Sequence, residues 1–164
     1  MREEALLIGI SQLGAVFAGF IAIFMVFTQA NGKFSPVDTL RARIIIFSSF
    51  VLVLAALLPL AMNGLAIAPA WIWPIATLIY LILAGMISID VVRRQRALSK
   101  EEAPDRNTRI FQIIARILNI ALFVTGILII AGIGQGGYYI LALLINLIMA
   151  GITFISFAMH RLFD

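Results

Sequence analysis

The chain contains no cysteine and a single histidine among its 164 residues. The absence of cysteine excludes a disulfide framework, a thiolate metal site and a cysteine nucleophile. The single histidine, His160, excludes bis-histidine haem ligation and a multi-histidine metal site within one chain. We therefore expect neither a cofactor nor a bound metal.

Charged residues are also scarce, at 12% of the chain, whereas a soluble domain has about 25%. Apolar residues make up 63%, and the mean hydropathy is +1.10. This composition excludes disorder and leaves too little polar surface for a water-soluble globule. The sequence predicts an all-α integral membrane protein in which residues 1–164 form a single transmembrane bundle.

Five apolar stretches are each long enough to cross a bilayer as a helix, which takes about 20 residues. We predict that these transmembrane helices cover residues 5–28, 44–67, 71–92, 110–133 and 138–159. The apolar runs are continuous and lack the alternation of a membrane β-barrel. Asp90 and Arg116 are the two ionised residues inside the stretches.

The distribution of Lys and Arg indicates the orientation, because positively charged flanks stay in the cytoplasm. Three basic residues follow the first stretch, six lie between the third and the fourth, and one is in the C-terminal tail, so ten of the twelve share one side. We predict an N-terminus outside, a C-terminus inside and a cytoplasmic loop over residues 93–109. The membrane expected is the plasma membrane, the inner membrane of a bacterium.

The sequence matches itself when residues 76–89 are aligned with residues 142–155. Eight of the fourteen residues in the first segment recur at the equivalent places in the second, and the same offset matches Trp73 with Tyr139. We interpret this as a parallel tandem repeat of two helical hairpins that follows one leading helix. Chance similarity between segments rich in Ile, Leu and Ala is the alternative.

Small residues are expected to mediate helix packing, because in lipid close backbone contact replaces the hydrophobic effect between helices. An Ala-Gly pair occurs in three of the predicted helices, as Ala18-Gly19, Ala84-Gly85 and Ala150-Gly151. We expect these pairs to pack inside the bundle. The alternative is that they form an interface with a second copy or with another membrane protein. Both a second copy and another membrane protein are expected partners.

Four polar residues on the predicted fourth helix, Arg109, Gln112, Arg116 and Asn119, follow one another at steps of three and four. Such steps place them on one helix face, which we call the polar stripe. In one interpretation Arg116 extends to the lipid headgroups, towards which its side chain tilts. In the other, which we favour, the stripe lines a pore or vestibule open to the cytoplasm, because amides cannot extend as far as an arginine.

Two further polar contacts are candidates within the membrane. Asp90 either pairs locally with Arg93 and Arg94 or forms a buried ion pair with Arg116. Tyr80 and Asn146 occupy equivalent positions of the repeat. They are candidates for a midplane polar pair if the two hairpins are related by an axis along the membrane normal. The alternative is that each side chain bonds separately to a neighbouring backbone carbonyl.

The sequence shows no nucleophile–base pair and no phosphate-binding loop before a catalytic lysine, so we expect no enzyme. Basic loops attract the anionic headgroups of the bilayer, and nearby carboxylates make nucleic-acid binding improbable. We predict an oligomeric channel or transporter for ions or small solutes with a cationic vestibule on the cytoplasmic side. The alternative is a non-transporting membrane module that assembles with or regulates a larger membrane complex.

Overall fold

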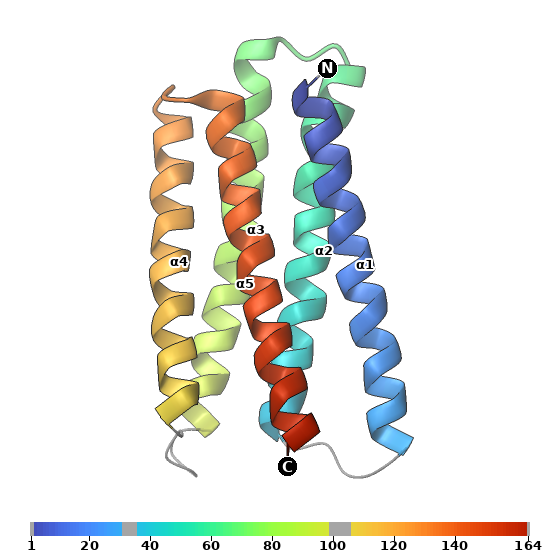
Figure 1. The fold of residues 1–164 in the computed structure, drawn as a ribbon. Helices are drawn as coiled ribbons and strands as arrows, with labels where there is room; N and C mark the ends of the chain where they lie inside the picture. The colour runs from blue at the N-terminus through green and yellow to red at the C-terminus, as the bar shows by residue number, and fades with distance from the viewer. Residues whose placement is uncertain (1, 31–35, 99–105, 164) are drawn as a thin grey trace.

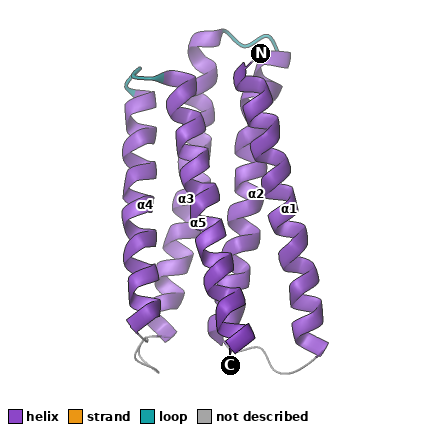
Figure 2. Ribbon diagram, viewed as in Figure 1, coloured by secondary structure: helices purple, strands orange, loops and turns teal. Residues whose placement is uncertain are grey.

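The structure, a computed structural model, describes residues 2–30, 36–98 and 106–163. These residues form five α-helices and no strand (Figures 1 and 2). The helices are α1 (Arg2–Ala30), α2 (Pro36–Gly64), α3 (Pro69–Leu98), α4 (Arg106–Ile130) and α5 (Gln135–Phe163). The all-α prediction is confirmed.

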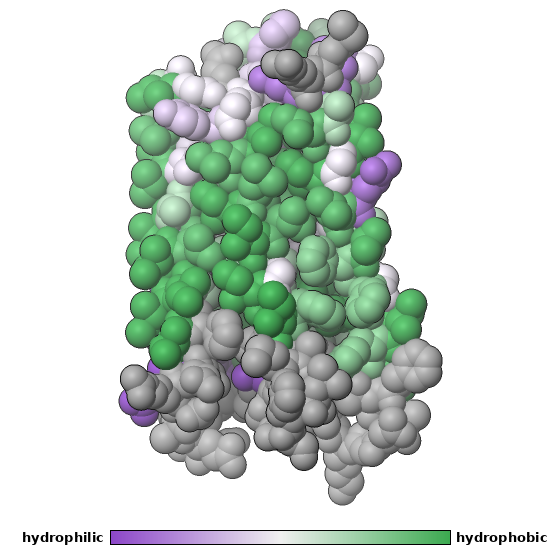
Figure 3. Space-filling view, in the orientation of Figure 1, coloured by the Kyte–Doolittle hydropathy of each residue, from purple (hydrophilic) through white to green (hydrophobic). Residues whose placement is uncertain are grey.

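Each helix contains a segment of the length and hydropathy that a membrane crossing requires. These segments are Glu3–Val26, Thr39–Gly64, Pro69–Ala97, Gln112–Ile130 and Gly136–Ile155. Figure 3 shows that apolar side chains cover most of the described surface on one face, with hydrophilic residues concentrated towards one end. An apolar exterior is stable in lipid and not in water, so the protein is a multi-pass membrane protein.

The helix ends differ from the predicted ones. α2 and α4 end at Gly64 and Ile130, three residues early, because the chain turns there through positive φ at Ala66 (55°) and Gly132 (84°). The predicted loop 93–109 is shorter than expected, since α3 continues to Leu98 and α4 starts at Arg106. Hydropathy identifies the part of a helix that lies in lipid. It does not identify the polar helical turns that extend beyond the membrane. Residues 99–105 of that loop lie outside the described residues.

The helices run up and down, with successive helices side by side (Figure 1). α2 contacts α5 and α3 contacts α4, so α2–α5 form a four-helix bundle, and α3 also contacts α5 across it. The backbone of α1 lies close to α2 and α5 and, in the described residues, not to α3 or α4. α1 is therefore a peripheral helix with one side packed on the bundle.

The main core joins all five helices through buried apolar side chains, among them Leu7, Leu52, Tyr80, Ile129 and Leu143. A second, smaller cluster of Ile21, Ala42 and Ile45 joins α1 to α2. The two helices are in close contact at Gly14, where an added Cβ would lie 3.0 Å from a methyl group of Val53. These contacts fix the side of α1 that faces the bundle.

Candidate functional site

The polar stripe on α4 is divided between the surface and a helix contact. Arg109 and Arg116 are exposed, whereas Gln112 and Asn119 are partly buried. The Oδ1 atom of Asn119 accepts a 3.3 Å hydrogen bond from the Ser88 hydroxyl of α3. The outer end of the stripe therefore faces α3.

The same face of α4 remains against α3 beyond Asn119. A Cβ on Gly85 would lie 3.7 Å from the Phe123 ring, and a Cβ on Gly126 would lie 2.7 Å from a methyl carbon of Leu81. The face expected to border a vestibule inside the chain is thus in contact with a neighbouring helix. Residue spacing carried no information about what lies opposite this face.

Arg116 forms no ion pair with Asp90 and has no other polar partner among the described residues. It lies four residues beyond the start of the apolar segment Gln112–Ile130, a rise of about 6 Å. Its side chain tilts towards the N-terminal end of α4, which is the nearer end of that segment. This position suits extension to the headgroups, the alternative that we had favoured less.

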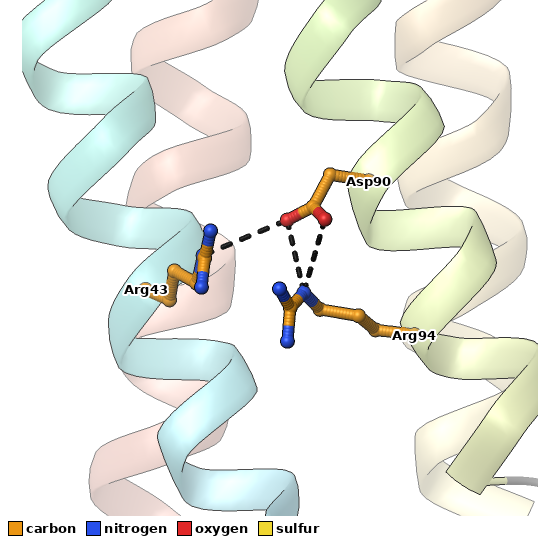
Figure 4. Close-up of polar contacts among 3 residues, drawn as sticks. All are labelled: Arg43, Asp90 and Arg94. Carbon is orange, nitrogen blue, oxygen red and sulfur yellow. Dashed lines mark hydrogen bonds and ion pairs between the residues drawn. The ribbon is translucent and has the colours of Figure 1, made fainter.

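Asp90 is paired with two other arginines (Figure 4). The Nε atom of Arg94 donates to both carboxylate oxygens at 3.0 Å, and Nε of Arg43 on α2 lies 3.5 Å from Oδ2. Of the two alternatives for Asp90, the buried pair with Arg116 is therefore wrong, and of the two local partners considered, the structure pairs Asp90 with Arg94. The Arg43 guanidinium also lies over the Phe47 ring, 5.2 Å from its centroid.

The sequence contained a signal for the Arg43–Asp90 contact. Positions 43 and 90 are equally far from the turn at residues 65–68, so an antiparallel hairpin places them at one depth. Positions 90 and 116 lie nine residues before and eleven residues after the 99–105 loop, at nearly the same depth, so depth alone did not distinguish the two arginines. The rotation of each helix about its axis selects Arg43 as the partner.

The structure brings together Tyr80 of α3 and Asn146 of α5. Their side chains are close together, and both residues are buried. The Tyr80 hydroxyl also lies 3.5 Å from the carbonyl oxygen of Ala142. Nearby, the rings of Trp73 and Tyr139 have centroids 5.6 Å apart. Each of the pairs Tyr80–Asn146 and Trp73–Tyr139 joins two positions that are equivalent in the sequence repeat.

The three Ala-Gly pairs have different surroundings. Gly85 faces Phe123 of α4, with Ala84 packed against the main core. Gly151 faces Phe17 of α1, and its neighbour Ala150 is buried. Ala18 is partly buried, but Gly19 is exposed, with no atom within 4 Å of a Cβ placed there. The expectation of packing inside the bundle is therefore wrong for Gly19, which lies on the outer side of α1.

Gln12, an exposed amide on α1 within the apolar segment Glu3–Val26, was not among the residues predicted from the sequence. The sequence feature that could have indicated this residue is an isolated amide within an apolar segment. Nor were the buried hydroxyls of Ser49 and Thr77 predicted, which have no hydrogen-bond partner in the described part of the chain. Hydroxyl groups on helices usually bond to a backbone carbonyl one turn back, so no pattern marks these two as exceptions.

Comparison with known proteins gives no relative from which a function can be inferred. No protein-family model matches the chain. No curated protein and no solved structure shows significant similarity to it.

Proposed function

We propose that the protein is a non-transporting membrane module, which assembles laterally with another transmembrane chain and does not conduct solute through its own bundle. The observation that supports this proposal is that the face of α4 from Asn119 to Gly126 packs against α3. A conducting vestibule inside the chain would require that face to be in contact with water. Asn119 instead bonds to Ser88, and Gly126 is in close contact with Leu81. We propose no catalytic residue and no cofactor.

The contact between α3 and α5 supports a bundle closed along its centre. The hydrogen bond from the Tyr80 hydroxyl to the Ala142 carbonyl and the Trp73–Tyr139 ring contact lie between these two helices. Tyr80 and Tyr139 are themselves in edge-to-face contact, with centroids 6.2 Å apart. A path for ions along this line would require the three aromatic rings to separate.

We also propose that the chain arose by duplication of a helical hairpin, with α2–α3 equivalent to α4–α5. The turns after α2 and α4 support this, because three backbone hydrogen bonds of one turn recur in the other, with donor and acceptor both displaced by the offset of the sequence repeat. The donors are Leu65, Ala66 and Ile67 after α2, and Ala131, Gly132 and Ile133 after α4. The two helices therefore end at equivalent positions of the repeat, with the same turn after each.

The contacts between hairpins have the same symmetry. A two-fold axis that exchanges α2 with α4 and α3 with α5 converts the α2–α5 contact into the α3–α4 contact, and both occur. The axis passes between α3 and α5, where Trp73 meets Tyr139 and Tyr80 meets Asn146. Equivalent residues of parallel helices meet in this way when the axis runs along the membrane normal.

A pore between subunits is a second candidate, and the position of Arg116 favours it. The guanidinium is exposed on α4 and has no partner among the described residues. Four or more copies around an axis would bring several such groups together and make an anion-selective ring. In that arrangement the outer surface of α4, and not its contact with α3, borders water.

Flux and thiol labelling separate these two functions. The purified protein in liposomes is expected to pass no more chloride or small solute than empty liposomes do. Because there is no native cysteine, single cysteines at positions 112, 116, 119 and 120 can be probed with a membrane-impermeant reagent. We expect no labelling at 119 and 120. Labelling at both 116 and 120, together with a flux that Arg116→Ala abolishes, would favour the pore between subunits.

We further propose the orientation with the N-terminus outside and the C-terminus in the cytoplasm, in the inner membrane of a bacterium. The exposed basic residues Arg93, Arg94 and Arg96 lie at the end of α3 that enters the 99–105 loop. These side chains would contact anionic headgroups of the cytoplasmic leaflet. Trp71, at the opposite end of α3, is exposed where an interfacial aromatic belt would lie.

A further inference from the structure

The Gln12 side chain points directly away from the bundle. It lies nine residues before Ile21, which is fully buried against α2. Nine residues make about two and a half turns of an α-helix, so the two side chains project from opposite sides of α1. Gln12 is exposed and makes no hydrogen bond with the described residues.

Gln12 also lies deep within the apolar segment. It is nine residues beyond Glu3, where the segment starts, a rise of about 13.5 Å. Half of the hydrocarbon thickness is about 15 Å, so the amide is close to the bilayer centre. A glutamine side chain extends by only a few ångströms, too short a distance to reach the headgroups. Its N–H and C=O groups therefore need a partner within the membrane.

The surface around Gln12 permits a second helix to approach. Five further residues follow the spacing of three and four on this side of α1: Ala5, Gly9, Val16, Gly19 and Ile23. We call these five residues and Gln12 the outer face of α1. A Cβ placed on Gly9 or Gly19 would have no atom of the chain within 4 Å, so both positions are open. Small residues above and below a polar group are typical of helix contacts in membranes.

We infer that the outer face of α1 binds the same face of a second copy of this chain, with the two Gln12 amides hydrogen-bonded to each other. The inference rests on the proposed lateral assembly and names its partner. An amide carries both donors and an acceptor, so it is complementary to an identical amide. Copies inserted with the same topology have parallel α1 helices, which place the two Gln12 residues at one depth across a two-fold axis.

Cysteine cross-linking in native membranes tests the geometry of this dimer. Single cysteines at positions 9, 12, 16 and 19 are expected to form disulfide-linked dimers under mild oxidation. Cysteines at the exposed positions 13 and 20, on a neighbouring side of α1, and at Ile82 of α3 are the controls and should form few. Efficient cross-linking of the controls, or none at 12 and 19, would overturn the inference.

Two substitutions test the energetics without disturbing the fold. Gln12→Leu removes the amide and is expected to weaken the dimer about fivefold to thirtyfold, the effect of one interhelical hydrogen bond. Gly19→Ile adds bulk at an open position and should also dissociate the dimer. Gly137→Ile is the matched control, because Gly137 is equally open but lies on α5. Dissociation is measured by energy transfer between labelled copies diluted in lipid, and unchanged transfer in both α1 variants would overturn the inference.

Failure of this inference is distinguishable from failure of the proposed function. Monomeric protein that passes no solute would overturn the self-association and leave assembly with another membrane protein standing. Solute flux through monomeric protein would overturn both. A dimer that cross-links through α3 or α4 would support lateral assembly and overturn the role of the outer face of α1.

Discussion

The hydroxyl of Tyr139 on α5 donates a 2.7 Å hydrogen bond to the backbone carbonyl of Ala55 on α2. Ala55 lies four residues before Pro59, which is inside α2 and has no N–H to donate to that carbonyl. In lipid, a carbonyl freed by proline needs a partner from a neighbouring helix. Tyr139, which is completely buried, supplies it.

Replacing Tyr139 by phenylalanine should therefore destabilise the protein through Pro59. We expect Tyr139→Phe to cost about 1–3 kcal/mol, because it leaves a buried carbonyl without a donor. In a Pro59→Ala chain the residue-59 N–H restores the helical bond, and the same substitution should cost clearly less. Unfolding in detergent of the single and double variants measures the coupling. Equal costs in both backgrounds would show that Tyr139 does not act on the freed carbonyl.

The Asp90 cluster predicts which arginine couples to the carboxylate. In double-mutant cycles for unfolding, Asp90→Asn should couple to Arg43→Gln and not to Arg116→Gln. The side chains of Asp90 and Arg43 are 43% and 44% exposed, so we expect a coupling of only a few tenths of a kcal/mol. Lower salt should increase it. A larger coupling with Arg116 would contradict the arrangement in Figure 4.

The close contact of α3 with α4 predicts a size limit at Gly126. A Cβ there would lie 2.7 Å from a Leu81 methyl carbon, so Gly126→Val should destabilise the protein by about 1–3 kcal/mol. Removing the opposing side chain with Leu81→Ala should recover part of this loss in the double variant. Gly137→Val, at an open glycine on α5, is the control, with thermal unfolding in detergent as the measurement. A neutral Gly126→Val would mean that the two helices are farther apart than the structure shows.

The hydrogen bond between Ser88 and Asn119 predicts a specific role for the α4 amide. Asn119→Leu should destabilise the protein by about 1 kcal/mol, because the Ser88 hydroxyl loses its acceptor. In a Ser88→Ala chain the same change should be nearly neutral. Both variants should leave the liposomes as impermeable as before. A change in solute flux would assign Asn119 to a conduction path.

The proposed orientation predicts opposite labelling at the two ends of α3. In whole cells, a cysteine at Leu65, in the turn before α3, should react with an impermeant thiol reagent. A cysteine at Ala97, near the other end, should react only after the cells are opened. Both positions are exposed, so neither result is limited by burial. The reverse pattern would place the basic residues outside.

The number of helices and their all-α character followed from the sequence alone. Continuous apolar runs that are long enough to cross a bilayer leave the backbone in lipid only one way to satisfy its hydrogen bonds. The depth of a residue was equally accessible, because rise per residue fixes it. Depth placed Arg116 level with Asp90 and Tyr80 level with Asn146, but Arg43 was not among the partners predicted for Asp90.

The tertiary structure determined the rotation of each helix about its own axis, and so which of its sides faces a neighbouring helix. That rotation directs Asp90 towards Arg43, the outer part of the polar stripe towards Ser88, and Gly19 out of the bundle. In a chain that is apolar on every side, the hydrophobic pattern does not distinguish a lipid-facing side from a buried one. Packing between side chains makes that distinction, as the Leu81 methyl carbons against Gly126 show. The spacing of residues along a single sequence does not show which of these packing contacts form.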